Sequence, residues 1–241
     1  MGDTGSQSTV RPFERDVAQH GGYLYTTDRL SSRLANARIS DAVLAAAHFD
    51  GARVIDIGCG DGTYTREIAS LARPALVHGV DPAASAIDVA HAASQDEALL
   101  SFGVASADEL PHTADEFDVA ILRGVLHHVD RPYDAIAEAL RVSQTLVVLE
   151  PNGLNPGLKL LERYSRYHVE HEERSYAPRR LDGWVAAAGG RVVRRQWVGF
   201  VPMFAPDGYA RTAKRVEPML ERAPGLRRLT CAQYILTASR G

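Results

Sequence analysis

The stretch that decides the fold is Val54-Ile55-Asp56-Ile57-Gly58-Cys59-Gly60-Asp61-Gly62, which is apolar at first and then almost entirely glycine and aspartate. This pattern predicts a buried strand that ends in a tight glycine turn and opens a helix, here from Thr63 to Ile68. Glycine tolerates a positive φ and lets the backbone approach a ligand closely. The stretch therefore predicts a small-molecule site at the end of the first strand.

The spacing of these glycines distinguishes between nucleotide ligands. A dinucleotide fingerprint, G-x-G-x-x-G, would need its third glycine where the chain has Thr63, but the glycine comes one residue early, at Gly62. The carboxylates of Asp56 and Asp61 beside the turn are unfavourable near a pyrophosphate and favourable near an ammonium or a sulfonium group. No Gly-Lys-Ser/Thr follows, so the Walker motif is absent as well. These features argue against NAD.

The segment Asp56 to Gly62 resembles the first motif, D/E-x-G-x-G-x-G, of class I S-adenosylmethionine-dependent methyltransferases. Further motifs follow in the family's order, and Leu-His-His-Val-x-x-Pro at 126–132 is similar to the fourth motif of the ubiquinone and menaquinone biosynthesis type, methyltransferase type 11. The resemblance implies an α/β, Rossmann-like seven-stranded sheet of order 3-2-1-4-5-7-6 with the last strand antiparallel, helices on both faces and a small cap. It also implies S-adenosyl-L-methionine as the cofactor and S-adenosyl-L-homocysteine as its product.

Composition restricts the class of protein. With 241 residues, 45% of them hydrophobic and 24% charged, the chain is long enough for one large α/β domain and a small cap. A net charge of -3 provides no basic field for nucleic acid. The two cysteines, Cys59 and Cys231, predict a reducing, cytoplasmic location rather than a disulfide framework. No apolar run reaches the roughly 18 to 20 residues of a membrane span, and the polar N-terminus lacks the apolar region of a signal peptide.

The residues before the first strand are expected to form a tail and a cap. Residues 1–20 are predicted to be disordered, whereas apolar residues recur at helical spacing within 21–50 and predict one or two helices. In the family that the chain resembles, such helices cap the cofactor pocket, which implies that Tyr25 and Arg33 reach it. The alternative is that both are ordinary packing or surface residues. The methyltransferase domain itself is expected to span 51–241.

A second apolar strand is predicted from Ala75 to Val80 and ends in Asp81 and Pro82. It lies about 20 residues after the glycine turn, where an acid suits a ribose, because one carboxylate can accept hydrogen bonds from both hydroxyls. Asp81 is therefore expected to bind the ribose of the cofactor. The alternative is that Asp81 caps the next helix, with Pro82 at its first position.

A third strand is predicted from Leu100 to Ala105 and is followed by Ser106 and Ala107. In the related methyltransferases this segment usually reads G-D-A-x-x-L-P, and its aspartate contacts the adenine amino group. Ser106 stands in the place of that aspartate, which departs from the family's pattern. Ser106 can still accept a hydrogen bond, and the backbone N–H of Ala107 is expected to reach the ring. A plain loop is the alternative.

Two adjacent histidines, His127 and His128, follow the predicted fourth strand, Phe117 to Arg123. They lie just past the carboxyl end of a parallel strand, where open α/β sheets bind ligands. Histidine titrates near neutral pH, so either one is a candidate general base. We favour His127, because some relatives that methylate small amines or sugars use the first position. A packed, hydrogen-bonded support is the alternative role.

Glu150 ends the predicted fifth strand, Thr145 to Leu149, at the same edge of the sheet as the histidines. It is expected to bind the substrate or to orient His127, and the alternative is that it caps the next turn. Two more strands are predicted, at Val192–Val198 and at Cys231–Thr237.

The segment 153–178 is the least patterned part of the chain and is the predicted substrate lid, because relatives insert substrate-capping structure between the fifth and sixth strands. Its tyrosines Tyr164, Tyr167 and Tyr176 are expected to line the acceptor pocket. The histidines and glutamates within 168–174 have a spacing that is more typical of a solvated helix face than of a metal site. No metal is therefore expected.

Together these motifs predict one site for a cofactor and a small acceptor. The predicted cofactor-binding residues are Tyr25, Arg33, Asp56, Gly58, Cys59, Gly60, Asp81, Pro82, Ser106, Ala107 and Arg123, and the predicted catalytic residues are His127, His128 and Glu150. We expect methyl transfer to a hydroxyl of a secondary metabolite, a sugar or a lipid intermediate, by a monomer or a homodimer. N- or C-methylation and cofactor binding without transfer stay open, whereas NAD-dependent oxidation is disfavoured by the glycine spacing. Nucleic-acid methylation is disfavoured, because the chain lacks the Asn/Asp-Pro-Pro-Tyr/Phe motif.

Overall fold

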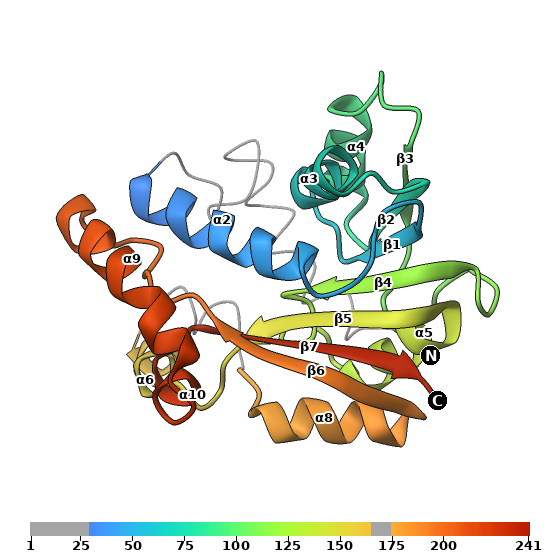
Figure 1. The fold of residues 1–241 in the computed structure, drawn as a ribbon. Coiled ribbons are helices and arrows are strands. Elements are labelled where there is room, and N and C mark those ends of the chain that lie inside the picture. Colours follow the sequence, from blue (N-terminus) through green and yellow to red (C-terminus); the bar gives the residue numbers. More distant parts are fainter. Residues whose placement is uncertain (1–28, 165–174) are drawn as a thin grey trace.

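A seven-stranded sheet forms the centre of the computed structural model, which describes residues 29–164 and 175–241 (Figure 1). In chain order the strands are β1 (Arg53–Ile57), β2 (Leu76–Asp81), β3 (Leu100–Val104), β4 (Phe117–Arg123), β5 (Ser143–Pro151), β6 (Gly190–Val198) and β7 (Gln233–Arg240). Their order across the sheet is β3-β2-β1-β4-β5-β7-β6. Strands β1 to β5 pair in parallel, and β7 is antiparallel to both β5 and β6. The predicted strand order and the antiparallel last strand are confirmed.

Helices cover both faces of the sheet. In chain order the described helices are α2 (Leu30–Leu44), α3 (Thr63–Ala72), α4 (Ala84–Ala92), α5 (Pro132–Val142), α6 (Pro156–Tyr164), α8 (Pro178–Ala187), α9 (Asp207–Arg222) and α10 (Leu226–Thr230). α2, α3 and α4 lie on one face and α5 and α8 on the other (Figure 1). None of the helices in the described part of the chain is long and apolar enough to cross a membrane.

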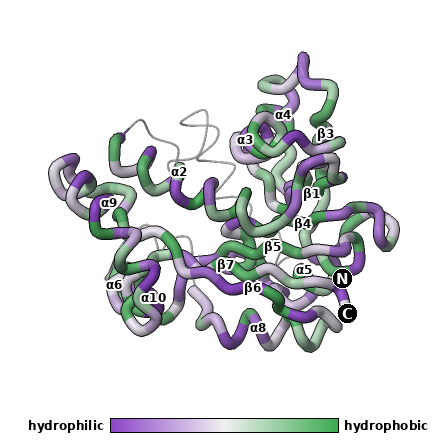
Figure 2. Tube along the Cα trace, in the orientation of Figure 1, coloured by the Kyte–Doolittle hydropathy of each residue, from purple (hydrophilic) through white to green (hydrophobic). Residues whose placement is uncertain are grey.

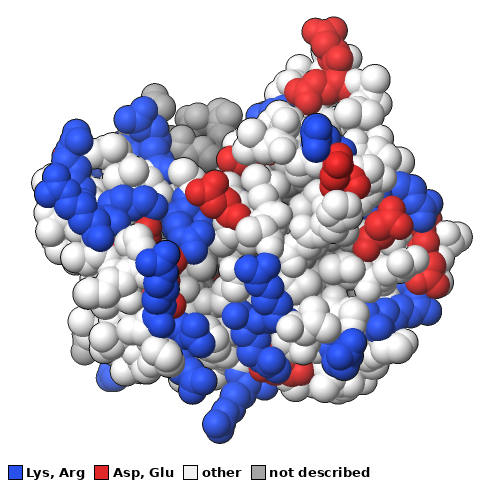
Figure 3. All heavy atoms as spheres, viewed as in Figure 1, with Lys and Arg blue, Asp and Glu red and all other residues white. Residues whose placement is uncertain are grey.

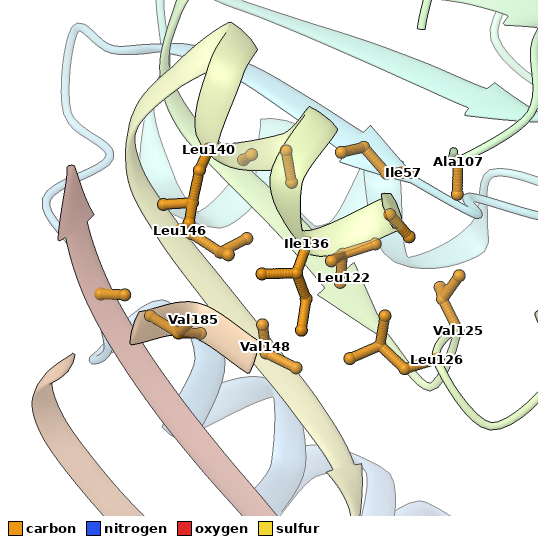
Figure 4. Packing of buried hydrophobic residues seen from close by; sticks show 14 of the residues in the cluster. Ile57, Ala107, Leu122, Val125, Leu126, Ile136, Leu140, Leu146, Val148 and Val185 are labelled. Atoms are coloured by element: carbon orange, nitrogen blue, oxygen red, sulfur yellow. The ribbon is translucent and has the colours of Figure 1, made fainter. Parts of the chain in front are cut away.

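The sheet is buried on both faces, which explains why its strands are nearly continuous apolar runs. Successive side chains of β1 point to opposite faces, so Ile55 and Ile57 pack under α5 whereas Val54 packs under α2 and α3. The tube in Figure 2 is accordingly green along the central strands. Figure 4 shows Ile136 and Leu140 of α5 packed on the apolar side chains of β4 and β5. The central strands therefore hold the carboxyl edge of the sheet rigidly.

Two helices, α6 and α10, were not expected from the sequence. The approach to α6 is rich in asparagine, glycine and proline and has the composition of a loop. The side chain of Asn155 nevertheless accepts hydrogen bonds from the N–H groups of Gly157 and Leu158, and Pro156 is the first helical residue. Asparagine followed by proline is a helix start signal, which the composition obscured. α6 occupies part of the predicted lid, and the role of that segment stays a prediction.

Packing around β2 leads to a stability prediction. A Cβ at Gly79 would lie 2.7 Å from Cδ1 of Phe102 and 2.9 Å from Sγ of Cys59, whereas a Cβ at Gly183 in α8 would meet no atom within 4 Å. We expect Gly79→Ala to lower the free energy of unfolding by about 1 to 3 kcal/mol through overpacking. Gly183→Ala should instead raise it by up to about 1 kcal/mol, because alanine favours helix. Urea unfolding of both variants measures the difference, and equal stabilities would contradict the packing described here.

Candidate active site

The glycine turn after β1 has the backbone conformation that only glycine adopts easily. Gly58, Gly60 and Gly62 have φ values of 77°, 55° and 72°. The N–H of Gly58 donates to the carbonyl of Val80 over 2.7 Å, so the turn is fixed to the end of β2. A Cβ at Gly58 would lie 2.5 Å from Cγ2 of Val125, so the turn also lies directly against the loop after β4. The predicted turn is confirmed, and it contacts both neighbouring strand ends.

The carboxylate of Asp81 closes the other side of this turn. Its Oδ2 accepts a hydrogen bond from the N–H of Gly60 and its Oδ1 accepts one from the N–H of Ala83, both over 2.9 Å. Burial raises the pKa of Asp81, while these two N–H groups oppose the shift. A carboxylate has about four lone-pair sites, so capacity for a diol remains. The alternative was that Asp81 caps α4 with Pro82 as the first helical residue. α4 begins at Ala84 instead, and its N-cap is Ala83.

Asp56, which was predicted to bind the cofactor, has a partner inside the protein. Its Oδ2 accepts a hydrogen bond from the hydroxyl of Thr65 over 2.6 Å, and only 3% of its surface is exposed. This bond ties α3 to β1 beneath the glycine turn. Burial raises the pKa of Asp56 above its ordinary value, and the hydrogen bond from Thr65 and the positive charge of Arg123 oppose only part of this rise. A contact of Asp56 with a cofactor stays a prediction.

Arg123, at the end of β4, lies in a cluster that the sequence analysis missed. Its guanidinium carbon lies 3.4 Å from the centroid of the Tyr64 ring, and its Nη1 donates to the hydroxyl of Ser40 over 3.2 Å. A carboxylate oxygen of Glu67 is 3.9 Å away. Burial lowers the pKa of Arg123, although Tyr64 and Glu67 counteract this. Tyr64 and Glu67 are three residues apart in α3, and this i, i+3 spacing could have shown that they share a face.

Ser106 follows β3 and donates its hydroxyl hydrogen to Oδ1 of Asp108. Oδ2 of Asp108 forms an ion pair with Arg131 over 2.5 Å. Burial raises the pKa of Asp108, but the Ser106 hydroxyl and Arg131 lower it by more, so the net shift is downward. With its hydrogen donated to Asp108, Ser106 presents lone pairs to any other partner. Within the described segments the N–H of Ala107 donates no hydrogen bond, so it can serve a ligand.

The histidine loop after β4 is organised by one buried carboxylate. Glu150 is fully buried, and its Oε1 accepts hydrogen bonds from the N–H groups of Val125 and Leu126 over 2.9 Å and 2.7 Å. Its Oε2 lies 2.6 Å from Nδ1 of His127. A carboxylate accepts, so Nδ1 carries the hydrogen and Nε2 is the basic nitrogen of the ring. The expected orientation of His127 by Glu150 is thus present as a contact.

The remaining predicted residues occupy different surroundings. The ring of His128 lies 3.8 Å from that of His127, between centroids. Cys59 is buried against Phe102 and α4, and burial raises the pKa of its thiol. Arg33 is exposed on α2 and has no side-chain hydrogen bond or ion pair within the described ranges.

The tyrosines that were expected near the cofactor or the acceptor are described only in part. Tyr25, Tyr167 and the side chain of Tyr164 lie outside the described residues. Tyr176 packs against Trp184, with ring centroids 4.9 Å apart.

The donor set fits a nucleoside that carries a positive charge. The glycines of the turn carry no side chain, so a ligand can approach their backbone closely. The carboxylate of Asp81 has spare acceptor capacity for a ribose, and the N–H of Ala107 can donate to a base. Asp61, whose Oδ1 accepts from the N–H of Thr63 over 3.0 Å, adds negative charge beside the turn. No group of three or more His, Cys, Asp or Glu side chains that could hold a metal occurs within 29–164 and 175–241.

Comparison with known proteins agrees with this geometry. A family model described as "Methyltransferase domain" matches residues 55–152, from β1 to just past β5. The ubiquinone biosynthesis O-methyltransferase of Burkholderia thailandensis is 30% identical over 66% of this chain and 73% of its own length. That of Bartonella tribocorum is 35% identical over 44% of this chain, which spans only 40% of the relative.

Solved structures show the same fold. Geranyl diphosphate C-methyltransferase from Streptomyces coelicolor A3(2), in complex with Mg2+, geranyl diphosphate and S-adenosyl-L-homocysteine, superimposes with a TM-score of 0.72. The alignment covers 100% of this chain and 99% of that one, at 13% identity. Likeness at this identity concerns the fold alone.

Asp56 provides a pH prediction for this site. Because burial raises its pKa, its contribution to stability is fully present below the ordinary pKa of aspartate and is lost as pH rises through the raised value. Asp56→Asn cannot ionise, so its free energy of unfolding relative to wild type should rise between about pH 4 and pH 7. Urea unfolding across this range measures the difference. Asp88→Asn, on the exposed side of α4, is the control, and a relative stability of Asp56→Asn that falls with pH would refute the argument.

Proposed function

The chain belongs to the class I S-adenosylmethionine-dependent methyltransferases, and from this premise we propose that it transfers a methyl group from S-adenosylmethionine to a hydroxyl of a small-molecule acceptor. The observation that carries the proposal is the pair formed by His127 and Glu150, whose Nδ1 and Oε2 atoms are 2.6 Å apart. His127 lies in the loop after β4, which contacts the glycine turn through Val125, and Glu150 lies on the neighbouring strand β5. A candidate base thus stands beside the candidate cofactor site.

The chain's part in cofactor binding follows from its own donors and acceptors. When bound, S-adenosylmethionine supplies a methyl group already activated on a sulfonium, so positioning can provide much of the rate. Asp81 would accept hydrogen bonds from the ribose, and the turn at Gly58 to Gly62 would let the nucleoside approach the backbone. Ser106 and the N–H of Ala107 would bind the base.

His127 would remove the proton of the acceptor hydroxyl. With Nδ1–H donated to Glu150, the lone pair of Nε2 can accept this proton as the oxygen becomes methylated, and solvent later removes it. The negative charge of Glu150 stabilises the imidazolium that forms, and its bonds to Val125 and Leu126 fix the direction of the ring. The names of the relatives, O-methyltransferases of ubiquinone biosynthesis, support an oxygen acceptor.

A screen with isotope-labelled S-adenosylmethionine tests this function. Phenols, sugars, amines and lipid intermediates are offered to the purified chain, and methylation of a hydroxyl compound is expected. Exclusive methylation of amines or of carbon would favour the N- or C-methyltransferase alternative. Binding of the cofactor without transfer to any class would favour a protein that binds but does not transfer.

We expect calorimetry to detect S-adenosylhomocysteine binding and no binding of NAD. Asp81→Ala should weaken that binding by about 1 to 3 kcal/mol, because charged hydrogen bonds are lost. Asp81→Asn removes the negative charge but keeps one oxygen that can accept a hydrogen bond from an N–H group of the turn, so it shows how much of the lost affinity is due to the charge. The exposed Asp88→Asn is the matched control. Tight NAD binding, or an unchanged affinity in both Asp81 variants, would contradict the assignment.

His127→Ala should lower turnover roughly 100-fold or more while S-adenosylhomocysteine affinity stays near wild type, because general base catalysis typically contributes that much. In wild type the rate should rise with pH as the imidazole becomes neutral, since only the neutral ring accepts a proton. Glu150→Gln, which keeps the shape but not the charge, should lower turnover too, and His128→Ala should do so less. The measurements are initial rates with the acceptor found in the screen.

Exposed His91 on α4 provides the control for these histidine variants. His91→Ala should leave the turnover and its pH dependence unchanged. If His127→Ala retained its turnover but unfolded at lower urea concentration, His127 would be a packing residue and not the base.

A further inference from the structure

The outer face of α9 combines positive charge with exposed apolar surface. The helix buries Ala210, Ala213 and Glu217 on its inner side. The opposite side presents Arg211, Arg215, Met219 and Arg222 at spacings of four, four and three residues, so that they form one stripe. The side chain of Met219 is 64% exposed.

The next helix extends the apolar part of this surface. α10 buries none of its residues, and Leu226 and Leu229 are 52% and 53% exposed. α6 contacts α10 and adds Leu160 and Leu161, which are 61% and 51% exposed. Single exposed apolar residues are ordinary, but a group of them on neighbouring helices marks an interaction site.

The acidic residues of α9 do not neutralise the stripe. Glu217 is buried and binds Lys214, and Glu221 forms an ion pair with Arg38. Asp207 is a single exposed acid in the first turn, at the far end of the helix from Met219 and Arg222. Arg211, Arg215 and Arg222 form no ion pair with any residue of the described segments. Figure 3 shows Lys and Arg gathered over α9 and the edge strand β6, whereas Asp and Glu lie mostly over the half that contains α3 and α4. The surface is therefore basic although the whole chain has a net charge of -3.

We propose that α6, α9 and α10 form a docking surface for an anionic lipid bilayer. Arginine binds lipid phosphate groups and is attracted to anionic headgroups, and leucine and methionine insert into the acyl boundary. A nucleic acid would use the arginines but leave the exposed leucines in water. The combination of both kinds of side chain favours the bilayer.

The docking surface is attached to the strand that carries Glu150. Asn152, two residues beyond Glu150, donates from its side-chain nitrogen to the carbonyl groups of Arg228 and Cys231, each over 2.9 Å. α6, α9 and α10 also lie at the end of the molecule toward which β4 and β5 point (Figure 1). Docking would hold the candidate active site close to the bilayer. An apolar acceptor dissolved in the membrane follows from this only if the proposed function is right, whereas lipid binding itself is independent of it.

Vesicle flotation of the full chain tests the proposal. The chain should float with vesicles of phosphatidylcholine and phosphatidylglycerol, less so at high salt, and hardly with phosphatidylcholine alone. Replacing Arg211, Arg215 and Arg222 together by glutamine should weaken partitioning roughly 10-fold or more. Leu226→Gln with Leu229→Gln should weaken it as well. The control pair is Leu71→Gln with Leu99→Gln, which alters leucines that are 62% and 48% exposed away from the docking surface.

Two further measurements distinguish a loss of lipid binding from a loss of folding. Urea unfolding and S-adenosylhomocysteine binding show whether each variant is folded, and lipid binding needs no methyl acceptor, so its failure is distinct from failure of the proposed function. The proposal is overturned if the wild-type chain does not float with anionic vesicles, or if the control pair loses as much partitioning as the docking variants. It is also overturned if the leucine variants abolish a dimer seen by sedimentation while no vesicle binding occurs, because a second copy would then cover the surface.

Discussion

The fully buried carboxylate of Glu150 is the constraint on which the candidate site depends. Removing an ionised group from water is strongly unfavourable unless hydrogen bonds replace the lost hydration. Glu150 obtains three, from the N–H groups of Val125 and Leu126 and from Nδ1 of His127. The same bonds that satisfy the charge determine the shape of the loop after β4 and the orientation of its histidine. The carboxylate of Glu150 therefore determines both the conformation of the loop and the position of the candidate base, and a substitution at Glu150 would alter both.

The glycine turn is coupled to this loop by close packing. Gly58 leaves no space for a side chain because Val125 lies against it, and Val125 is itself held by Glu150. On the other side, the N–H of Gly60 is bound by Asp81 at the end of β2. Three strand ends thus fix one another, and a nucleoside held by the ends of β1 and β2 would be placed against the histidine in the loop after β4. This is the arrangement expected at the carboxyl edge of an open α/β sheet.

Sequence reasoning succeeded where local pattern and topology coincide. Strands buried on both faces have a strong apolar signal, so β1 and its neighbours were found within a few residues, and strand ends that share an edge predicted the contact of Glu150 with His127. The failures concern contacts between side chains that are distant in sequence. The stacking of Arg123 on Tyr64 depends on how α3 lies over β4, which no local pattern reports. The partner of Asp56 was missed for the same reason.

The C-terminal helices show how a surface can be tied to a site without entering it. α10 buries no residue of its own, but the side chain of Asn152, just past the end of β5, binds the carbonyl of Arg228 in α10 and that of Cys231 directly after it. A buried amide that satisfies two carbonyls is costly to remove, so the position of α10 relative to Glu150 is fixed by hydrogen bonds. Any partner that binds the arginines and leucines of this surface would therefore approach the histidine loop in one orientation. The hydrogen bonds of Asn152 thus fix the distance and direction from the docking surface to the candidate active site.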